Sequence, residues 1–306
     1  MTTEEARLFM EAKGKDGAKP LAVPPLREYG RTPRIVLPKG ACDTHVHIFG
    51  PFKQFPFQPT HAFSHVDNHE STLDDWVRMQ DALGLSRALH VASAGYGKTY
   101  EPVLHSLCRF PDRLRGLICP PSGITDGELD ILTKAGVVGT RHVFPSSPVI
   151  DNTIIARTHE LGWKPHYVWV GNKQLEQWHD PILASPGDFV IEHCGNIDTS
   201  EGFDGPGFRF LLEALDTGRA WIRITFRFSK NPYPYRDLIP YLQRLAELAP
   251  DRLMWGSDWP HPNHFDAVPN DVDLIDALLE WFPDEDIRNK VLVTNPQVCL
   301  KFPPVT

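Results

Sequence analysis

Cysteine is scarce in this chain and follows no disulfide or metal-binding pattern. The 306 residues include five cysteines, and no two of them form a C-x-x-C pair. A scattered, odd-numbered set argues against a disulfide framework and against a thiolate zinc site. We therefore expect the cysteines to be small buried thiols.

The sequence also lacks an excess of positive charge and long apolar runs. It has 31 Lys and Arg against 39 Asp and Glu, a net charge of −8, and no run of five or more basic residues. Such a chain offers no basic stripe to a phosphate backbone, so we expect no nucleic-acid partner. No segment approaches the about 20 apolar residues that cross a bilayer, and residues 1–20 carry charges where a secretory signal is apolar. These absences predict a cytoplasmic protein with no membrane partner.

The chain divides into an N-terminal arm and one domain. Residues 1–40 are polar, rich in proline and without a sustained apolar period, so we interpret them as an irregular arm. Residues 41–306 alternate short apolar runs with segments of helical period, which is typical of repeated βα units. The predicted strands are 42–49, 87–92, 115–119, 137–144, 166–170, 188–193, 221–226 and 252–255. The predicted helices are 72–83, 101–109, 127–135, 153–161, 174–179, 208–216, 238–248, 274–281 and 287–293.

This alternation predicts an α/β fold, a single (β/α)8 TIM-like barrel. The first strand is not followed by the G-x-G-x-x-G turn of a dinucleotide-binding sheet, which favours the barrel over a doubly wound sheet. In barrels of this kind the functional residues lie where the strands end. The sequence therefore predicts functional residues at the ends of the strands.

Three predicted strands end in residues with catalytic side chains. In the first strand, His45 and His47 are two positions apart, so both side chains point to the same face. The sixth ends at His193, and the eighth leads into Asp258. Each of these residues alone also has a structural interpretation; Asp258, for example, would be a loop carboxylate that caps backbone N–H groups. Their shared position at the strand ends favours a common site.

The motifs that carry these residues resemble those of a known family. DTHVH, EHCG and WGSDWPHPN, in this order, resemble the amidohydrolase superfamily (amidohydrolase-related family 2). GACDTHVHIFGP with FPF, GVVGTRHVF and DRLMWGSDWPHPN resemble more narrowly its 2-pyrone-4,6-dicarboxylate lactonase branch. The resemblance spans residues 38–302 and implies one barrel, hydrolysis of a carboxylated lactone, and a role in aromatic-acid or sugar-acid catabolism.

The resemblance also implies roles for individual residues. Asp258 matches the general base, and His45, His47 and His193 match the histidines that polarise the lactone carbonyl. Arg141 matches a carboxylate-binding arginine, and Arg227 matches a second one when a one-residue gap is allowed. The full set of candidate substrate-binding residues is Arg141, Ser93, Arg227, His261, Trp169 and Asn196.

The sequence departs from the branch at two arginines. Ser146, Ser147 and Pro148 stand where the branch has a second arginine after the fourth strand, and Asn196 stands where it has another. Each lost charge-assisted hydrogen bond is worth about 1.5–3 kcal/mol, enough to change the preferred anion. We expect a different small anionic lactone, carboxylated or sulfonated, of the pyrone or muconolactone type.

The sequence leaves one Zn²⁺ as an alternative to a site without a cofactor. His45, His47, His193 and Asp258 are the ligands if a divalent ion is bound. Members of the superfamily with one metal usually have a histidine where this chain has Trp169, and members with two often have a lysine where it has Arg141. The resemblance therefore favours catalysis without a metal.

Other activities and assemblies stay open at this point. A sugar-acid lactone isomerase would use the same residues, and a zinc-dependent hydrolase or decarboxylase belongs to the same superfamily. A ligand-binding barrel without activity is a further alternative, and the sequence leaves a homo-oligomer open.

Overall fold

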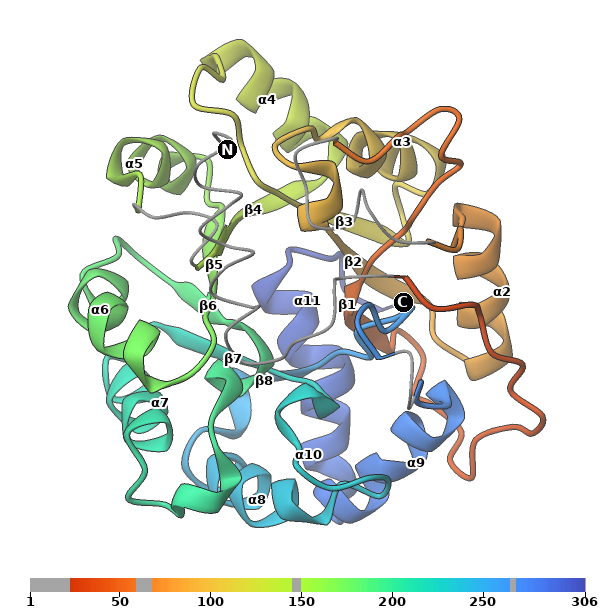
Figure 1. The fold of residues 1–306 in the computed structure, drawn as a ribbon, viewed down its shortest axis with the longest axis vertical. Coiled ribbons are helices and arrows are strands. Elements are labelled where there is room, and N and C mark those ends of the chain that lie inside the picture. Colours follow the sequence, from red (N-terminus) through yellow and green to blue (C-terminus); the bar gives the residue numbers. More distant parts are fainter. Residues whose placement is uncertain (1–22, 59–67, 145–149, 265–267, 306) are drawn as a thin grey trace.

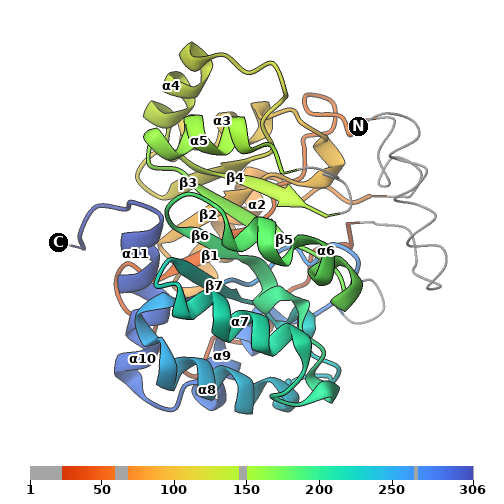
Figure 2. The same cartoon turned by 90° about the vertical axis from the view of Figure 1, so that its left-hand side faces the viewer.

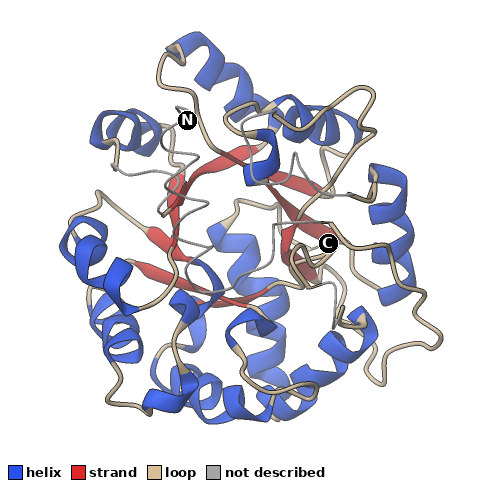
Figure 3. Ribbon diagram, viewed as in Figure 1, coloured by secondary structure: helices blue, strands red, loops and turns tan. Residues whose placement is uncertain are grey.

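Eight parallel strands form one sheet, ordered β1 to β8 as in the sequence, in the computed structural model. The structure describes residues 23–58, 68–144, 150–264 and 268–305. Figure 3 shows the strands as a ring surrounded by helices. The strands are β1 (Cys42–Val46), β2 (Arg87–Val91), β3 (Leu114–Ile118), β4 (Val137–Val143), β5 (Lys164–Val168), β6 (Phe189–Ile191), β7 (Ala220–Ile224) and β8 (Leu253–Trp255). The predicted (β/α)8 barrel is confirmed, with all eight strands.

The outer helices follow the strands along the chain. They are α2 (Leu73–Leu83), α3 (Glu101–Arg109), α4 (Asp126–Ala135), α5 (Asn152–Glu160), α6 (Asn172–Leu183), α7 (Pro206–Asp216), α8 (Ile239–Leu248), α9 (Asp271–Trp281), α10 (Glu285–Asn289) and α11 (Asn295–Cys299), most of them labelled around the ring in Figure 1. Thr72 and Thr125 each form a capping box at the start of α2 and α4. Both helices end at a glycine with a left-handed backbone.

Some predicted bounds are wrong. The sixth strand ends at Ile191 instead of 193, because the chain turns sharply over Glu192–Asn196. The helix predicted over 174–179 runs from Asn172 to Leu183 and contains Pro181, a residue that a sequence pattern treats as a stop. The helix predicted over 287–293 is α10 followed by a π-helical turn, Lys290–Thr294.

One end of the barrel is closed by the end of the chain. Cys299, Leu300 and Phe302, at and after the end of α11, pack with buried residues of the strands such as Cys42 and Trp221. Figure 2 shows α11 and the C-terminus together at one end of the barrel. A site that needs access to solvent is therefore at the other end, where the strands finish.

The described part of the arm, residues 23–40, contains no helix or strand and is fastened to the barrel. Arg31 forms ion pairs with Asp273 and Asp276 of α9, both at 2.6 Å. Arg27 donates to the backbone oxygen of Val268 at 2.6 Å. Residues 1–22 of the predicted arm lie outside the described residues, and the domain boundary after residue 40 stays a prediction.

The cysteines only partly follow the expectation of buried thiols. All five are free, and Cys42, Cys194 and Cys299 are buried. Cys119 is intermediate and Cys108 is exposed, so the expectation is wrong for Cys108, on the outer helix α3. Within the described residues, no helix has both the length and the apolar character that a membrane span requires.

The join between β8 and β1 leaves no room for a side chain at Gly256. A Cβ added there would lie 2.7 Å from Cβ and 2.9 Å from the backbone nitrogen of His45. The backbone N–H of Gly256 donates to the oxygen of Ile224 at 2.9 Å, which fixes the position of the chain. The close approach of the first and last strands therefore depends on this glycine.

We expect Gly256→Ala to lower the free energy of unfolding by about 1–3 kcal/mol, the usual cost of overpacking a close contact. Urea titration followed by circular dichroism measures this change. Gly123→Ala is the control, because an added Cβ there meets nothing within 4 Å; its effect should stay within about 0.5 kcal/mol. Equal effects of the two substitutions would contradict the close-contact explanation.

His179 links α6 to α7 and makes stability depend on pH. Its Nδ1 lies 2.7 Å from Oδ1 of Asp180 and its Nε2 lies 2.8 Å from Oε2 of Glu213. Burial lowers the pKa of His179, but the hydrogen bonds to these two carboxylates outweigh it and raise the pKa above its ordinary value of 6.5. The resulting stabilisation is fully present below the unfolded pKa and is lost as the pH rises through the folded pKa.

We expect His179→Gln to destabilise the protein at about pH 5.5 and to have little effect at about pH 8.5. The loss should be below about 1 kcal/mol, because Asp180 and Glu213 are exposed and solvent screens the pairs. Urea midpoints of both proteins at the two pH values test this. An effect of His179→Gln that is the same at both pH values would refute the linkage.

Candidate active site

His45 and His47 lie at the end of β1, and their imidazole rings meet at the open end of the barrel. His45 is fully buried and His47 almost so. Nε2 of His45 lies 3.2 Å from Nε2 of His47. Nδ1 of His47 lies 2.8 Å from the backbone oxygen of Val91 in β2, so this nitrogen carries a hydrogen and donates it. The alternation of side chains along a strand thus brings the two rings together as expected.

His193 reaches the same place through the turn that follows β6. His193 and Cys194 have φ angles of 52° and 47°, in the left-handed region. This backbone costs a non-glycine residue about 1–2 kcal/mol, and such strain is typical of functional sites. The turn brings the ring of His193 to 4.6 Å from that of His45, centroid to centroid. Nδ1 of His193 is hydrogen-bonded to the hydroxyl of Thr225 at 2.8 Å.

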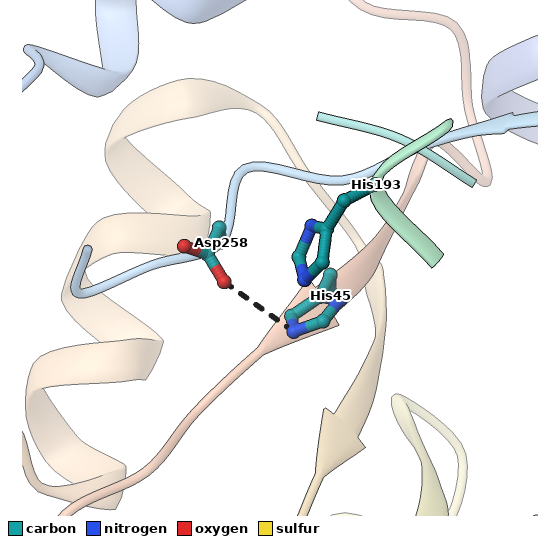
Figure 4. A group of neighbouring side chains, drawn as sticks. All are labelled: His45, His193 and Asp258. Atoms are coloured by element: carbon teal, nitrogen blue, oxygen red, sulfur yellow. Dashed lines mark ion pairs between the residues drawn. The ribbon is translucent and has the colours of Figure 1, made fainter. Parts of the chain in front are cut away.

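Asp258 follows β8 and faces the histidines. Figure 4 shows its carboxylate directed at His45, with His193 beside them. Oδ1 of Asp258 lies 3.3 Å from Nε2 of His45 and 3.7 Å from Nε2 of His47. Oδ2 accepts a hydrogen bond from Nη1 of Arg227 at 2.6 Å. The structure therefore brings Asp258, the three histidines and Arg227 together.

The backbone around Asp258 is held in place by β1. The amide of Asp258 donates to the oxygen of His45 at 2.9 Å. The buried carboxylate of Asp43 accepts from the backbone nitrogen of Ser257 at 2.9 Å and from its hydroxyl at 2.5 Å. Asp258 itself has a left-handed φ of 64°. These contacts fix the carboxylate against the imidazoles.

Burial sets the charge states of the central residues. It lowers the pKa of His45, His47 and His193 well below 6.5, so the three imidazoles are neutral at physiological pH. Burial also raises the pKa of Asp258, while the Arg227 guanidinium acts in the opposite direction. A carboxyl group with a raised pKa is a better general base than an ordinary aspartate.

Arg141 is beneath these residues and is already paired. Its Nε and Nη2 donate to Oε2 of Glu192 at 3.1 and 2.9 Å, and its Nη1 donates to the oxygen of Ala92 at 2.9 Å. Arg227 is more accessible, with 23% of its side chain exposed, and also donates to the oxygen of Pro262. Arg227 is thus the arginine that contacts both the central carboxylate and solvent.

The other candidate substrate-binding residues have structural contacts of their own. The hydroxyl of Ser93 accepts from the amide of Gly95 at 3.1 Å. Nε2 of His261 lies 3.0 Å from Oδ1 of Asp271. Their contacts with a substrate stay predictions.

Trp169 and Asn196 are in contact with each other, and Asn196 follows His193 closely in the chain. The Trp169 ring is buried against Phe210 of α7, at 5.4 Å between centroids. The side-chain amide of Asn196 donates to the backbone oxygen of Trp169 at 2.6 Å. Ser146, Ser147 and Pro148, which replace an arginine of the branch, lie outside the described residues. The substrate roles of Trp169 and Asn196 also stay predictions.

Sequence reasoning assigns no role to Glu192 or Arg223, yet both are fully buried beneath the site. Nη1 of Arg223 donates to Oε1 of Glu192 at 2.9 Å. A usable signal was present, because both are charged residues within or directly after short apolar strands. What the sequence does not reveal is that the two residues are partners.

The residues present a zinc-type donor set whose surroundings do not suit zinc. His45, His193 and Asp258 each offer a ligand atom, all within 4.8 Å of one another, and Oδ1 of Asp258 is buried without a hydrogen-bond partner in the structure. However, a ligating histidine normally donates its second N–H to a carboxylate or carbonyl, whereas Nδ1 of His45 faces Nη1 of Arg223 at 3.4 Å. Arg227 places a further cation on Asp258. These two cationic neighbours argue against a divalent ion at this set.

A separate cavity of about 520 Å³ lies between α6 and α7, outside the barrel. Its lining includes His179, Arg209 and Glu213, and none of the candidate site residues. The convergence of side chains, not cavity size, therefore identifies the site.

Comparisons with known proteins agree with this arrangement. The chain matches the amidohydrolase family over residues 42–302. It is 34% identical over 274 residues to a 4-sulfomuconolactone hydrolase of Rhizobium radiobacter, covering 86% of this chain and 90% of the relative. It is 30% identical over 282 residues to a 2-pyrone-4,6-dicarboxylate hydrolase of Comamonas testosteroni, covering 86% of this chain and 91% of the relative.

One further relative and one solved structure are also similar to this chain. A D-galactarolactone isomerase of Agrobacterium fabrum is 28% identical over 285 residues, covering 90% of this chain and 96% of the relative. The apo crystal structure of Atu3138 from Agrobacterium tumefaciens superposes with a TM-score of 0.77 at 26% identity, covering 89% of this chain and all of that one. With its barrel, its strand-end residues and a family match over residues 42–302, the chain belongs to the amidohydrolase family.

Proposed function

We propose that this chain is a lactone hydrolase that opens a small carboxylated or sulfonated lactone of the pyrone or muconolactone type, in aromatic-acid or sugar-acid catabolism. The observation that carries the proposal is the buried carboxylate of Asp258, with a raised pKa, against neutral imidazoles. The names of the relatives, 4-sulfomuconolactone hydrolase and 2-pyrone-4,6-dicarboxylate hydrolase, support the substrate class.

In the proposed reaction Asp258 takes a proton from water while the water oxygen forms a bond to the lactone carbonyl carbon. The carbonyl oxygen becomes an oxyanion, which an imidazole N–H stabilises. The ring C–O bond then breaks, and the proton held by Asp258 goes to the departing oxygen. The product is the open hydroxy acid or its keto form, and Asp258 is ionised again.

The rate enhancement that these groups can provide is sufficient for the hydrolysis of an activated lactone. General base catalysis contributes about 10²–10⁴-fold, and an oxyanion donor about 10²–10³-fold. These factors are sufficient when the departing oxygen is enol-like, and they are small for an amide or a phosphate ester. We therefore propose a substrate with a stabilised leaving oxygen.

The charges around the site favour an anion. Arg141 and Arg223 share the single carboxylate of Glu192, and Arg227 is paired with Asp258. Among these five groups, three guanidinium groups against two carboxylates leave one positive charge. The buried Asp43 next to them adds less than a full negative charge near neutral pH, because burial raises its pKa to about 7. Both arginines are paired, but Arg227 is the more exposed of the two, so we assign Arg227 first, and Arg141 second, to the anionic group of the substrate.

We propose that this reaction needs no cofactor, with one Zn²⁺ as the alternative. The cationic neighbours of His45 and Asp258 support this proposal. In the zinc alternative, His45, His47, His193 and Asp258 act as ligands.

A lactone isomerase is the second candidate, favoured by the similarity to D-galactarolactone isomerase. The same Asp258 and histidines would pass the acyl group to a neighbouring hydroxyl of the substrate. Water is not consumed in that reaction, which separates it from hydrolysis.

We expect Asp258→Asn to lower kcat by about 10²–10⁴-fold, because an amide cannot accept the proton of water. Turnover of a panel of carboxylated and sulfonated lactones measures the loss. Asp130→Asn, at an exposed position on α4, is the matched control and should leave turnover unchanged. Full activity of Asp258→Asn on every accepted lactone would contradict the proposed mechanism.

Reaction in ¹⁸O-labelled water should place one labelled oxygen in the product carboxylate, as mass spectrometry detects. A rearranged lactone without label identifies the isomerase instead.

For the metal, we expect protein purified without chelator to contain far less than one zinc per chain and to keep its turnover after chelation. Elemental analysis and a paired activity assay test this. One zinc per chain together with loss of turnover on chelation would make the three histidines and Asp258 ligands and reject catalysis without a cofactor.

A further inference from the structure

Arg223 contacts three buried groups at the centre of the barrel. It is fully buried in β7, and its Nη1 donates to Oε1 of Glu192 at 2.9 Å. The same Nη1 lies 3.4 Å from Nδ1 of His45, and Nη2 lies 2.9 Å from Nδ1 of His166. A guanidinium has only donors, so both imidazoles accept at Nδ1.

A neutral imidazole that accepts at Nδ1 carries its hydrogen on Nε2. Burial lowers the pKa of His45 and His166 well below 6.5, which keeps both rings neutral. At His166, Nε2 is buried without a hydrogen-bond partner in the structure, so Arg223 is the contact that selects its tautomer. At His45, Nε2 points to the site, toward Nε2 of His47 and Oδ1 of Asp258.

We propose that Arg223, held by Glu192, is a positioning residue that fixes His45 as an Nε2–H donor at the active site. The direction of the hydrogen bonds then follows from one contact to the next. Arg223 donates to His45, His45 donates to Nε2 of His47, and His47 donates to the backbone oxygen of Val91. Oδ1 of Asp258 lies 3.3 Å from the same Nε2 of His45 without a hydrogen bond. His45 thus contributes an N–H, and not a lone pair, at the point where the proposed oxyanion forms.

The same contact opposes a metal ion at His45. Coordination through Nε2 needs the other tautomer, whose Nδ1–H would face the N–H of Arg223. Two donors directed at each other are unfavourable in a buried site. Arg223 therefore selects between two uses of the same histidine, as donor or as ligand.

The test is nitrogen NMR of the full-length protein with ¹⁵N-labelled histidine rings, with His45 assigned by comparison with His45→Gln. We expect a pyridine-type signal from Nδ1 of His45 and a pyrrole-type signal from Nε2. A pyrrole-type Nδ1 in the unaltered protein overturns the proposal, and this outcome requires no variant of Arg223.

The variant Arg223→Met should lose this pattern, giving a mixed or reversed pair of signals. Arg141→Met is the matched control, because it removes another buried arginine from Glu192 but leaves the contact between Arg223 and His45. It should keep the pattern, as should Arg223→Lys, whose ammonium has only donors. An unchanged pattern in Arg223→Met overturns the proposal.

Zinc binding gives a second measurement. In equilibrium dialysis with Zn²⁺ alone, Arg223→Met should bind about 10–100-fold more tightly than Arg141→Met, the range associated with the partner of a ligating histidine. Since both variants remove one positive charge, equal affinities reject selection by Arg223.

This inference rests on the proposed function only for the use of the His45 N–H. The expected nitrogen signals without turnover of any lactone would reject the proposed function and keep the tautomer. Turnover of a lactone together with a pyrrole-type Nδ1 of His45 would keep the proposed function and reject the proposed tautomer.

Discussion

The buried carboxylate of Glu192, shared by Arg141 and Arg223, is the interaction on which the rest of the site depends. Removing a charge from water costs several kcal/mol, and only close pairing and good hydrogen bonds offset this cost. Glu192 supplies two oxygens to arginines from β4 and β7, two strands that are not neighbours in the barrel. Loss of Glu192 would leave two guanidinium groups unpaired in the interior, whereas loss of either arginine leaves one ion pair, so Glu192 is the charge on which this set depends.

The same set determines the electrostatics above it. A carboxylate between two guanidinium groups leaves positive charge, and this charge adds to burial in keeping the nearby imidazoles neutral. It also provides an attractive potential for an anionic ligand. The ion pairs of Glu192 in the barrel interior therefore also affect the charge states of the imidazoles at the ends of the strands.

The site is assembled where the barrel closes. Gly256 allows β8 to approach β1 closely, and Asp43 in β1 binds Ser257 directly before Asp258. The carboxylate of Asp258 thus meets His45 of β1 and His47, directly after β1, across the join between the first and last strands. Any loosening of this join separates the base from the imidazoles, which links packing at Gly256 to activity.

The amino-acid sequence by itself determined the eight strands, the order of the elements and the common face of His45 and His47. These features depend on the period of apolar residues and on the alternation of side chains, which are local properties. The position of His193 and Asp258 at strand ends was predictable once a barrel was recognised.

Only the tertiary structure decided which charges are partners. It paired Arg141 and Arg223 with Glu192, Arg227 with Asp258, and buried Trp169 against α7. Each pair joins residues that are 31 or more positions apart, so no local pattern specifies it. Strand tilt and barrel closure set these distances, and the cost of an unpaired buried charge then selects the partners.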